Sequence, residues 1–518
     1  MRDHADAPYG LEQIIGDIAR SVQLRNEQRL HDALICVNQV LERAPHFAPA
    51  LLNRATILAD LTRYEEGLAD CQQYLAHAPA APGITQFRDT MRDTALAYYD
   101  NKLRADPADE DSLFKRANIH LQTGDLAHAE QEYAALLAAY PAHQGALTNH
   151  GYVLTMLNRL DDALAAYDRL LAHHPDDAVN IYNRANVLKD LCRYGDARAA
   201  YQQAIALRPG FAEAHVELGL CHLAQGDFAA GWPLFEWRWH TAQMRHRYLK
   251  TAQPAWLGES ELDGRTILLW AEQGLGDTMQ FARLAPRIAD LGAHVILRAP
   301  AVLVTLLQSM DDRIRVISDQ DVLPSFDLHC PIMSLPLALR LDGVPALDQA
   351  HRMQPDHARM QHWDDWLGAR TRPRIGLVWS GKQSGRVNAT RDMPLTALLP
   401  LAGLDADFVC LHKDITATDV QTLAQLPAWR SAGALMGNFS DAAALVAQLD
   451  LVVSVDTAMA HLAGALGTPG YLLLRSSGEW RWQQQADITP WYPSLRILRQ
   501  REPGVWHDVV EQLRTELA

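Results

Sequence analysis

Three residues near the C-terminal end of the chain, Asp456, Thr457 and His461, have the types and spacing of an anion-binding turn. They follow a valine-rich run, Leu451–Val455, whose apolar character predicts a buried parallel strand. Asp456 and Thr457 are acceptors suited to the start of a helix, which we expect over Ala458–Leu466. The free N–H groups and positive dipole end of such a helix attract an anion, and His461 lies one turn further on. The alternative is an ordinary capped helix with a buried histidine that binds nothing.

A second polar turn follows the apolar run Thr266–Trp270. Gly274 and Gly276 permit a tight turn, and the carboxylate of Asp277 can serve as a general base or as an N-cap of the next helix. The two roles do not exclude each other. Position 279 is Met where a dinucleotide fingerprint needs its third glycine, which disfavours an NAD or flavin enzyme.

Two cations stand close together in the sequence of the second half. Lys382 lies in a Trp-Ser-Gly-Lys segment between Gly381 and Gly385, and Arg391 follows. The glycines allow a phosphate to approach, and cations near it would stabilise charge on a leaving phosphate. A solvated loop lysine is the alternative for Lys382.

Alternating apolar runs and amphipathic stretches must position these turns. The first set has expected strands at 266–270, 295–297, 314–317 and 326–331, with helices at 278–291 and 301–309. The second set has expected strands at 375–379, 408–411, 451–455, 471–474 and 495–498, with helices at 418–426, 440–449, 458–466 and 507–517. This alternation predicts parallel, doubly wound sheets in two Rossmann-like domains, 263–368 and 369–518, with ligands between the carboxyl ends of their strands.

The first half is a repeat array. Prolines recur at positions 45, 79, 107, 141, 175 and 209, so four of the five intervals are 34 residues and one is 28. Small and aromatic residues keep the same period, as shown by Ala117, Gly151, Ala185 and Gly219 and by Tyr133, Tyr167, Tyr201 and Phe235. The pattern resembles the tetratricopeptide repeat and predicts an all-α solenoid over 11–240, followed by a linker at 241–262. The interval of 28 predicts a shortened unit.

Two aromatic clusters lie outside these patterns. Trp232, Trp237 and Trp239 favour a seal between the last repeat and the next domain over a sugar-binding platform. The second cluster favours packing over stacking on a base or sugar, and comprises Trp480, Trp482, Trp491 and Tyr492.

Composition narrows the class of protein. The chain has 518 residues, enough for three domains, and a formal charge of −15, which argues against a nucleic-acid partner. Its six cysteines are scattered without metal-ligand spacing, which is typical of reduced thiols in the cytoplasm. We see no signal peptide, membrane-spanning run, Walker lysine, His-Glu-x-x-His motif or serine elbow. We therefore expect a cytoplasmic protein without a metal or cofactor.

The motifs of the second half resemble glycosyltransferase family 9, which includes the ADP-heptose:lipopolysaccharide heptosyltransferases. The resemblance lies in Gly276-Asp277, in WSGK with Lys382 and in SVDTAMAHLAGALG. It implies a GT-B fold of two facing Rossmann-like domains, the first on the acceptor side and the second binding the nucleotide-sugar. Repeats followed by a GT-B half are also similar in architecture to the protein O-linked N-acetylglucosamine transferases.

The resemblance also implies roles for individual residues. Asp456, Thr457 and His461 match the donor-binding motif, and Ala458 stands where the family has Gly. Lys382 matches a lysine that neutralises the donor phosphate.

On the acceptor side the resemblance gives Asp277 the role of general base. On the donor side, Lys413 or Asp414, after the strand at 408–411, stands where the family holds the ribose. Apart from the resemblance, Arg391 can add a second cation to stabilise the leaving diphosphate. The first α/β unit, from about 264 to 366, is short for a heptosyltransferase.

These inferences predict an inverting, metal-independent glycosyltransferase that moves a sugar from a nucleotide-sugar to a hydroxyl group. The acceptor would be a protein or a glycan, held by the repeats. The alternative is a scaffold in which the repeats bind partner proteins and the sugar-nucleotide domain no longer turns over. The presence of all the motif residues favours the enzyme.

Overall fold

A computed structural model describes residues 11–78, 83–345, 352–381 and 391–518. The chain divides into two compact units, residues 1–180 and 181–518, and the division falls inside the repeat array. The boundaries expected from the sequence at residues 240, 262 and 368 stay predictions.

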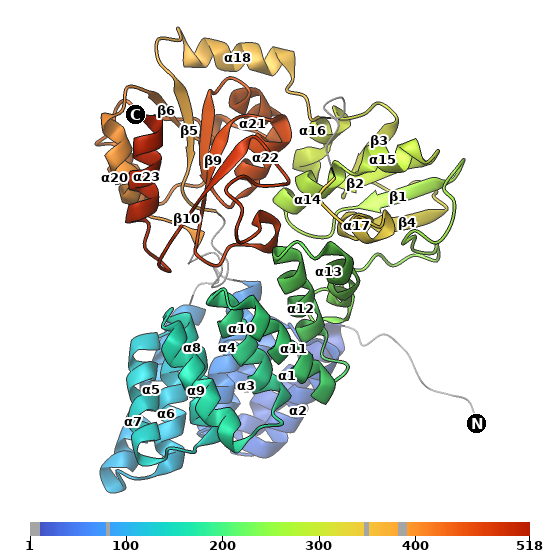
Figure 1. The fold of residues 1–518 in the computed structure, drawn as a ribbon. Helices are drawn as coiled ribbons and strands as arrows, with labels where there is room; N and C mark the ends of the chain where they lie inside the picture. Colours follow the sequence, from blue (N-terminus) through green and yellow to red (C-terminus); the bar gives the residue numbers. More distant parts are fainter. Residues whose placement is uncertain (1–10, 79–82, 346–351, 382–390) are drawn as a thin grey trace, which may run out of the picture. The chain divides into compact units, whose positions relative to one another are not determined.

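The first unit is a stack of antiparallel helices (Figure 1). Its helices are α1 (Leu11–Asn26), α2 (Leu30–Arg43), α3 (Ala48–Asp60), α4 (Tyr64–His77), α5 (Ile84–Ala105), α6 (Glu110–Gln122), α7 (Leu126–Ala139), α8 (Gln144–Met156) and α9 (Leu160–His173). Small residues at the helix crossings explain the close packing. A methyl group on Gly151 would stand 2.7 Å from the ring of Tyr167, so only glycine leaves room for that buried aromatic ring.

The short proline interval corresponds to helix α5. Where the other units have two helices, this one has a single helix of 22 residues, packed against α4 and α6. The prediction of a shortened unit is therefore confirmed.

The second unit begins with the last repeats and ends with two sheets. Its first helices are α10 (Ala178–Asp190, which starts in the first unit), α11 (Tyr194–Leu207), α12 (Ala212–Ala224), α13 (Phe228–Phe235) and the 3-10 helix η1 (Glu236–His240). Trp232 is buried, with its ring 5.3 Å from that of Trp480 and 6.2 Å from that of Phe281. Trp232 therefore seals the last repeat against the α/β region, as predicted, and Trp239 lies 5.6 Å from Trp270, whereas Trp237 stacks on His215 of α12 within the repeats.

The first sheet is entirely parallel, in the order β3-β2-β1-β4. Its strands are β1 (Thr266–Trp270), β2 (His294–Ala299), β3 (Ile314–Ser318) and β4 (Leu328–Pro331). The accompanying helices are α14 (Leu275–Ala282), α15 (Ala285–Asp290), η2 (Ala301–Leu303), α16 (Val304–Gln308), η3 (Ile332–Ser334) and α17 (Leu335–Ala338). The single helix predicted over 278–291 is wrong in extent. The chain forms α14 and α15 instead, with a break before Pro286, whose ring fits the first turn of a helix but not an interior.

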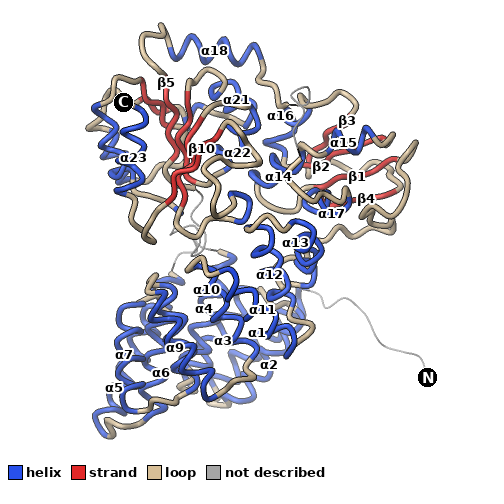
Figure 2. The backbone as a smooth tube through the Cα atoms, in the orientation of Figure 1, coloured by secondary structure: helices blue, strands red, loops and turns tan. Residues whose placement is uncertain are grey.

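The second sheet is also parallel, in the order β10-β9-β8-β5-β6-β7, and is separate from the first (Figure 2). Its strands are β5 (Arg374–Val378), β6 (Asp407–Cys410), β7 (Arg430–Ser431), β8 (Leu451–Val455), β9 (Gly470–Leu474) and β10 (Leu495–Arg499). The helices are α18 (His357–Leu367), η5 (Leu395–Gly403), α20 (Ala417–Leu423), η6 (Gly433–Leu435), α21 (Phe439–Val446), α22 (Ala458–Leu466), η7 (Trp480–Trp482) and α23 (His507–Leu517). Strand β8 and helices α22 and α23 have the predicted bounds, whereas β7 and α18 were not predicted.

All six cysteines lie in the described ranges and none forms a disulfide there. Within the same ranges, none of the helices combines the length and the apolar character needed to cross a membrane.

Candidate functional site

Helix α22 begins after β8 where predicted, but the Thr457 side chain does not cap it. Thr457 is the N-cap residue, with extended backbone angles (φ −139°, ψ 170°), and Gly467 closes the helix in the left-handed region (φ 77°). The Thr457 hydroxyl lies 3.0 Å from the Ser454 hydroxyl and, in the described part of the chain, accepts no N–H from the helix. The first N–H groups of α22 are therefore not capped by this side chain and can face an anion. Ala458, the first residue of the helix, is partly exposed.

His461 is buried one turn into α22. Its Nδ1 lies 2.9 Å from the hydroxyl of Tyr492, and its Nε2 lies 3.9 Å from Oδ1 of Asp456. Burial, with the nearby charges of Arg481 and Arg283, holds the pKa of His461 well below its ordinary value. The imidazole is therefore neutral and serves as a hydrogen-bonding group rather than a cation.

Gly276 brings the two predicted turns together. A methyl group on Gly276 would stand 2.6 Å from Cδ2 and 3.1 Å from Nε2 of His461. Helix α14 therefore packs directly on α22, and glycine is needed where the backbone of α14 meets the imidazole.

Asp277 lies at the start of α14, but not at the N-cap position that the sequence suggested. Gly274 is the N-cap, and Asp277 is the third helical residue, whose Oδ2 accepts the Gly274 N–H at 3.1 Å. The carboxylate thus caps the helix by reaching back, which stabilises its positive end. Its other oxygen, Oδ1, is buried and forms an ion pair with Arg481 at 2.7 Å.

Arg481 was not predicted as a site residue. It lies in η7, and its side chain is 10% exposed. Besides the ion pair with Asp277, its Nη1 donates to Oε1 of the buried Gln280 at 2.7 Å. A signal was present in the sequence, because an arginine between two tryptophans that pack in a core must find a buried partner.

Asp456 is held in a mixed charge environment. Burial raises its pKa and the Glu479 carboxylate adds to this effect, while Arg481 and Arg391 oppose it. Two arginines therefore lie within electrostatic reach of the turn. Arg391 precedes the motif in the chain and Arg481 follows it.

Arg391 lies beside the turn, as the sequence argument requires. A methyl group on Gly381 would stand 2.3 Å from Nη2 of Arg391 and 3.4 Å from Cγ2 of Thr457, so Gly381 lies next to both side chains. Asp392 accepts the Gly381 N–H at 3.0 Å and the Arg391 Nε–H at 3.3 Å, which fixes this part of the segment. Lys382, the predicted phosphate-binding lysine, lies outside the described residues.

The predicted ribose residues, Lys413 and Asp414, are exposed in the loop after β6, and their role stays a prediction. Their neighbour His412 was missed. Its buried Nε2 accepts the N–H groups of Trp379 and Ser380, each at 3.0 Å, and burial lowers the pKa of His412 to about 4. A neutral imidazole thus fixes the backbone just before Lys382.

The second aromatic cluster is a packing cluster. Its rings are almost fully buried, and the ring of Tyr492 fits against Gly464, where a methyl group would stand 2.3 Å from it. Trp482 lies 5.1 Å from His461, ring to ring. These side chains fix α22 on its neighbours, in agreement with the packing alternative, and comprise Trp480, Trp482, Trp491 and Tyr492.

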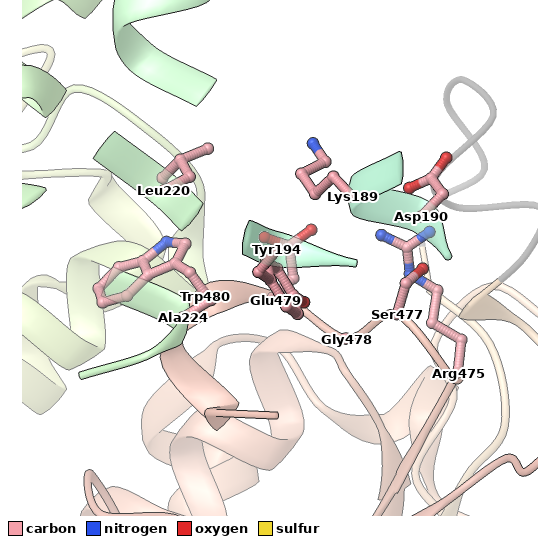
Figure 3. Close-up of a pocket in the computed structure, with 10 residues that line it drawn as sticks. All are labelled: Lys189, Asp190, Tyr194, Leu220, Ala224, Arg475, Ser477, Gly478, Glu479 and Trp480. Atoms are coloured by element: carbon pink, nitrogen blue, oxygen red, sulfur yellow. The ribbon is translucent and has the colours of Figure 1, made fainter. Parts of the chain in front are cut away.

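A pocket in the second unit lies where the last repeats meet the segment after β9 (Figure 3). Trp480 and Leu220 lie toward one end, and Arg475 and Asp190 toward the other. Lys189, one of the lining residues, forms an ion pair with Glu217 at 2.5 Å. The segment is tied to the repeats, because Gln484, just beyond Arg481, donates to Sγ of Cys192 at 3.1 Å and accepts from the Tyr194 hydroxyl at 3.4 Å. The pocket is lined by Lys189, Asp190, Tyr194, Leu220, Ala224, Arg475, Ser477, Gly478, Glu479 and Trp480.

Comparisons with known proteins agree with this architecture. Residues 92–144 and 182–235 match the tetratricopeptide repeat, and residues 408–514 match glycosyltransferase family 9 (heptosyltransferase). The protein FlbA of Caulobacter vibrioides is 27% identical over 322 residues, which are 57% of this chain and 53% of FlbA. The chain therefore spans about half the length of that relative.

Solved structures resemble the repeats only weakly. A crystal structure of MamA is 21% identical and covers 32% of this chain and 98% of its own, with a TM-score of 0.29. MamA 41-end from Desulfovibrio magneticus RS-1 is 22% identical and covers 34% of this chain and 91% of its own, with a TM-score of 0.28. Similarities of this size carry no information about function.

The fold is that of an all-α repeat solenoid followed by a GT-B-like pair of parallel α/β domains. Specifically, the chain combines tetratricopeptide repeats in its N-terminal region with a glycosyltransferase family 9 domain at its C-terminal end.

Proposed function

We propose that the chain is an inverting glycosyltransferase that moves a sugar from a nucleotide-sugar to a hydroxyl group of a protein or glycan. The observation that supports this most is the packing of α14 on α22. Through Gly276 and His461 it brings the carboxylate of Asp277 close to the turn at Asp456 and Thr457. A nucleophile-activating group and an anion-binding helix end are the two parts that such a reaction needs.

Bond cleavage places negative charge on the departing nucleoside diphosphate. The N–H groups at the start of α22 are oriented toward that charge and need no reorganisation as it develops. Arg391, beside Thr457, would add a cation, and Lys382 a second one. This arrangement can stabilise the leaving group without a metal ion.

The acceptor hydroxyl attacks the anomeric carbon from the face opposite the leaving diphosphate, and its proton passes to Asp277. Oδ1 of Asp277 is buried against Arg481, whereas 18% of the side chain as a whole is exposed. Oδ2 is therefore the oxygen that an acceptor would reach. Capping of α14 by the same oxygen uses one lone pair and leaves another for the proton.

The repeats would hold the acceptor or its carrier. The hydrogen bonds of Gln484 with Tyr194 and Cys192 support this role, because they link the last repeats to the segment that bears Arg481. An acceptor bound by the last repeats would thus lie beside the segment after β9, which carries Arg481 into the candidate site.

The test is mass spectrometry of the products formed from a panel of nucleotide-sugars with protein and glycan acceptors. Wild type should transfer one sugar, and Asp277→Asn should lower turnover by about 10²–10⁴-fold. Asn keeps an oxygen that can cap α14, so the loss would reflect the proton acceptor more than the helix. Lys382→Met should mainly weaken nucleoside diphosphate binding, measured by calorimetry. Diphosphate binding without transfer to any acceptor would favour the scaffold alternative, and absence of binding would exclude the donor site.

A further inference from the structure

Arg481 connects the two α/β domains at the candidate site. It comes from η7, which follows β9 of the second sheet in the chain, and among the described residues its polar contacts with side chains of the first domain are on α14. One guanidinium nitrogen lies 2.7 Å from Oδ1 of Asp277, and the other donates to Gln280 at 2.7 Å. The face of Trp480 lies 5.3 Å from the guanidinium carbon.

Acidic and polar side chains surround Arg481. Asp277 and Gln280 face it from α14, and the carboxylates of Asp456 and Glu479 lie within electrostatic reach. A guanidinium that is nine-tenths buried is costly unless such partners compensate it. The arrangement therefore holds the arginine in one place rather than allowing it to sample solvent.

We propose that Arg481 is the positioning residue for Asp277: it holds Oδ1 and thereby presents Oδ2 to the acceptor hydroxyl. This inference rests on the proposed function. Without the ion pair, rotation about the Cβ–Cγ bond of Asp277 would exchange its two oxygens. With it, one oxygen is fixed against the arginine and the other faces the N-terminal end of α14, where Gly274 donates to it.

The fork shape of the guanidinium matters for this role. One nitrogen pairs with Asp277 while another bonds Gln280, so the direction of the first contact is fixed by the second. An ammonium group has the charge without the planar fork. Arg481→Lys should therefore keep part of the orientation of the Asp277 carboxylate, and Arg481→Ala should lose all of it.

The main experiment compares steady-state turnover, donor KM and nucleoside diphosphate affinity in wild type and variants. Arg481→Ala should lower kcat by about 10²-fold while diphosphate affinity changes by less than about 3-fold. Added guanidinium ions should recover part of the kcat of Arg481→Ala but leave Asp277→Asn unchanged. A loss of diphosphate affinity with an unchanged kcat would overturn the proposal, because the arginine would then bind donor rather than position the base.

Arg499→Ala is the matched control. Arg499 is also a largely buried arginine, and it donates to the carbonyl of Gln483, which directly follows η7. It has no contact with Asp277 in the described part of the chain, so its removal should lower stability while kcat stays within about 3-fold of wild type. Equal losses of kcat in Arg481→Ala and Arg499→Ala would show a general loosening of the segment and would contradict the proposal.

Hydrogen exchange separates this proposal from the proposed function. In Arg481→Ala and in Arg481→Lys, which is the variant more certain to fold, amides at residues 274–282 should exchange faster than in wild type. In Arg499→Ala they should not. If wild type transfers no sugar, the proposed function fails, and this comparison still decides whether Arg481 fixes α14. Unchanged exchange in both Arg481 variants would refute the proposal.

Discussion

Gly276 lies so close to His461 that a methyl group would stand 2.6 Å from the imidazole Cδ2. This contact joins α14, the helix after the first strand of the first sheet, to α22, a helix of the second sheet, at positions 185 residues apart in the chain. A single hydrogen atom in place of a side chain therefore sets the spacing between the candidate base and the candidate donor turn.

Gly276→Ala should separate α14 from α22. The added methyl cannot fit without a shift of the buried imidazole, so we expect a loss of about 1–3 kcal/mol in the free energy of unfolding, measured with urea. Gly403→Ala is the control, because a methyl there meets no atom within 4 Å, and it should change stability by less than about 0.5 kcal/mol. Equal effects of the two substitutions would contradict the close packing.

Tyr492→Phe should leave Nδ1 of His461 without its partner. The hydroxyl lies 2.9 Å from that nitrogen in a buried environment, and loss of one partner of a buried hydrogen bond costs about 1–3 kcal/mol. Tyr471→Phe should cost less, because its hydroxyl meets the partly exposed Arg496 at 3.4 Å. Urea unfolding of both variants measures the difference, and a smaller loss for Tyr492→Phe would be evidence against the His461–Tyr492 bond.

Glu272 should make stability depend on pH in the neutral range. Burial raises the pKa of Glu272 from its ordinary 4.5 to about 7, although Arg238 lies 3.1 Å away and opposes the shift. The folded state therefore keeps a proton that the unfolded state loses, and the stability from this group falls as pH rises from 4.5 to 7. Relative to Glu272→Gln, which stays neutral, wild type should lose about 3 kcal/mol over this range. A difference that does not vary with pH would show that Glu272 stays ionised.

His412 should make the stability of the fold depend on pH in a more acidic range, and with the opposite sign to Glu272. Its folded pKa is lowered to about 4, so the unfolded state takes up the proton first as the solution is acidified below 6.5. The stability due to this residue is present above 6.5 and is lost as pH falls to 4. Relative to His412→Phe, wild type should lose about 3 kcal/mol over that range, as measured by thermal or urea unfolding. A constant difference would mean that the imidazole is protonated in the fold.

The strands were predictable because their mostly apolar residues are compatible only with a buried element. The run Leu451–Val455 has no charge on either face and could only be a buried element, and it is β8 with those bounds. The sequence also shows Pro286, yet the predicted helix over 278–291 continues through it. The break arises because proline lacks an N–H and cannot serve a helix interior. The short strand β7 has two residues, too few for any periodic pattern to show.

The candidate site was predictable in part. Asp277, Gly276 and His461 could be selected from their turns, but nothing in their spacing says that Gly276 touches His461. Arg481 could not be paired with Asp277 in advance, because the two are 204 residues apart and lie on different domains. His412 gave no signal either, since its role comes from the two N–H groups that directly follow strand β5.

By itself the sequence determined the repeats, the two parallel sheets and the helix start at Thr457, because each depends on residues near one another in the chain. Period, apolar runs and caps are local properties. Only the tertiary structure decided that Asp277 meets Arg481, that His461 is neutral and that His412 is buried against the backbone after β5. Those outcomes depend on burial and on charges brought together from distant segments, and neither is fixed until the domains pack.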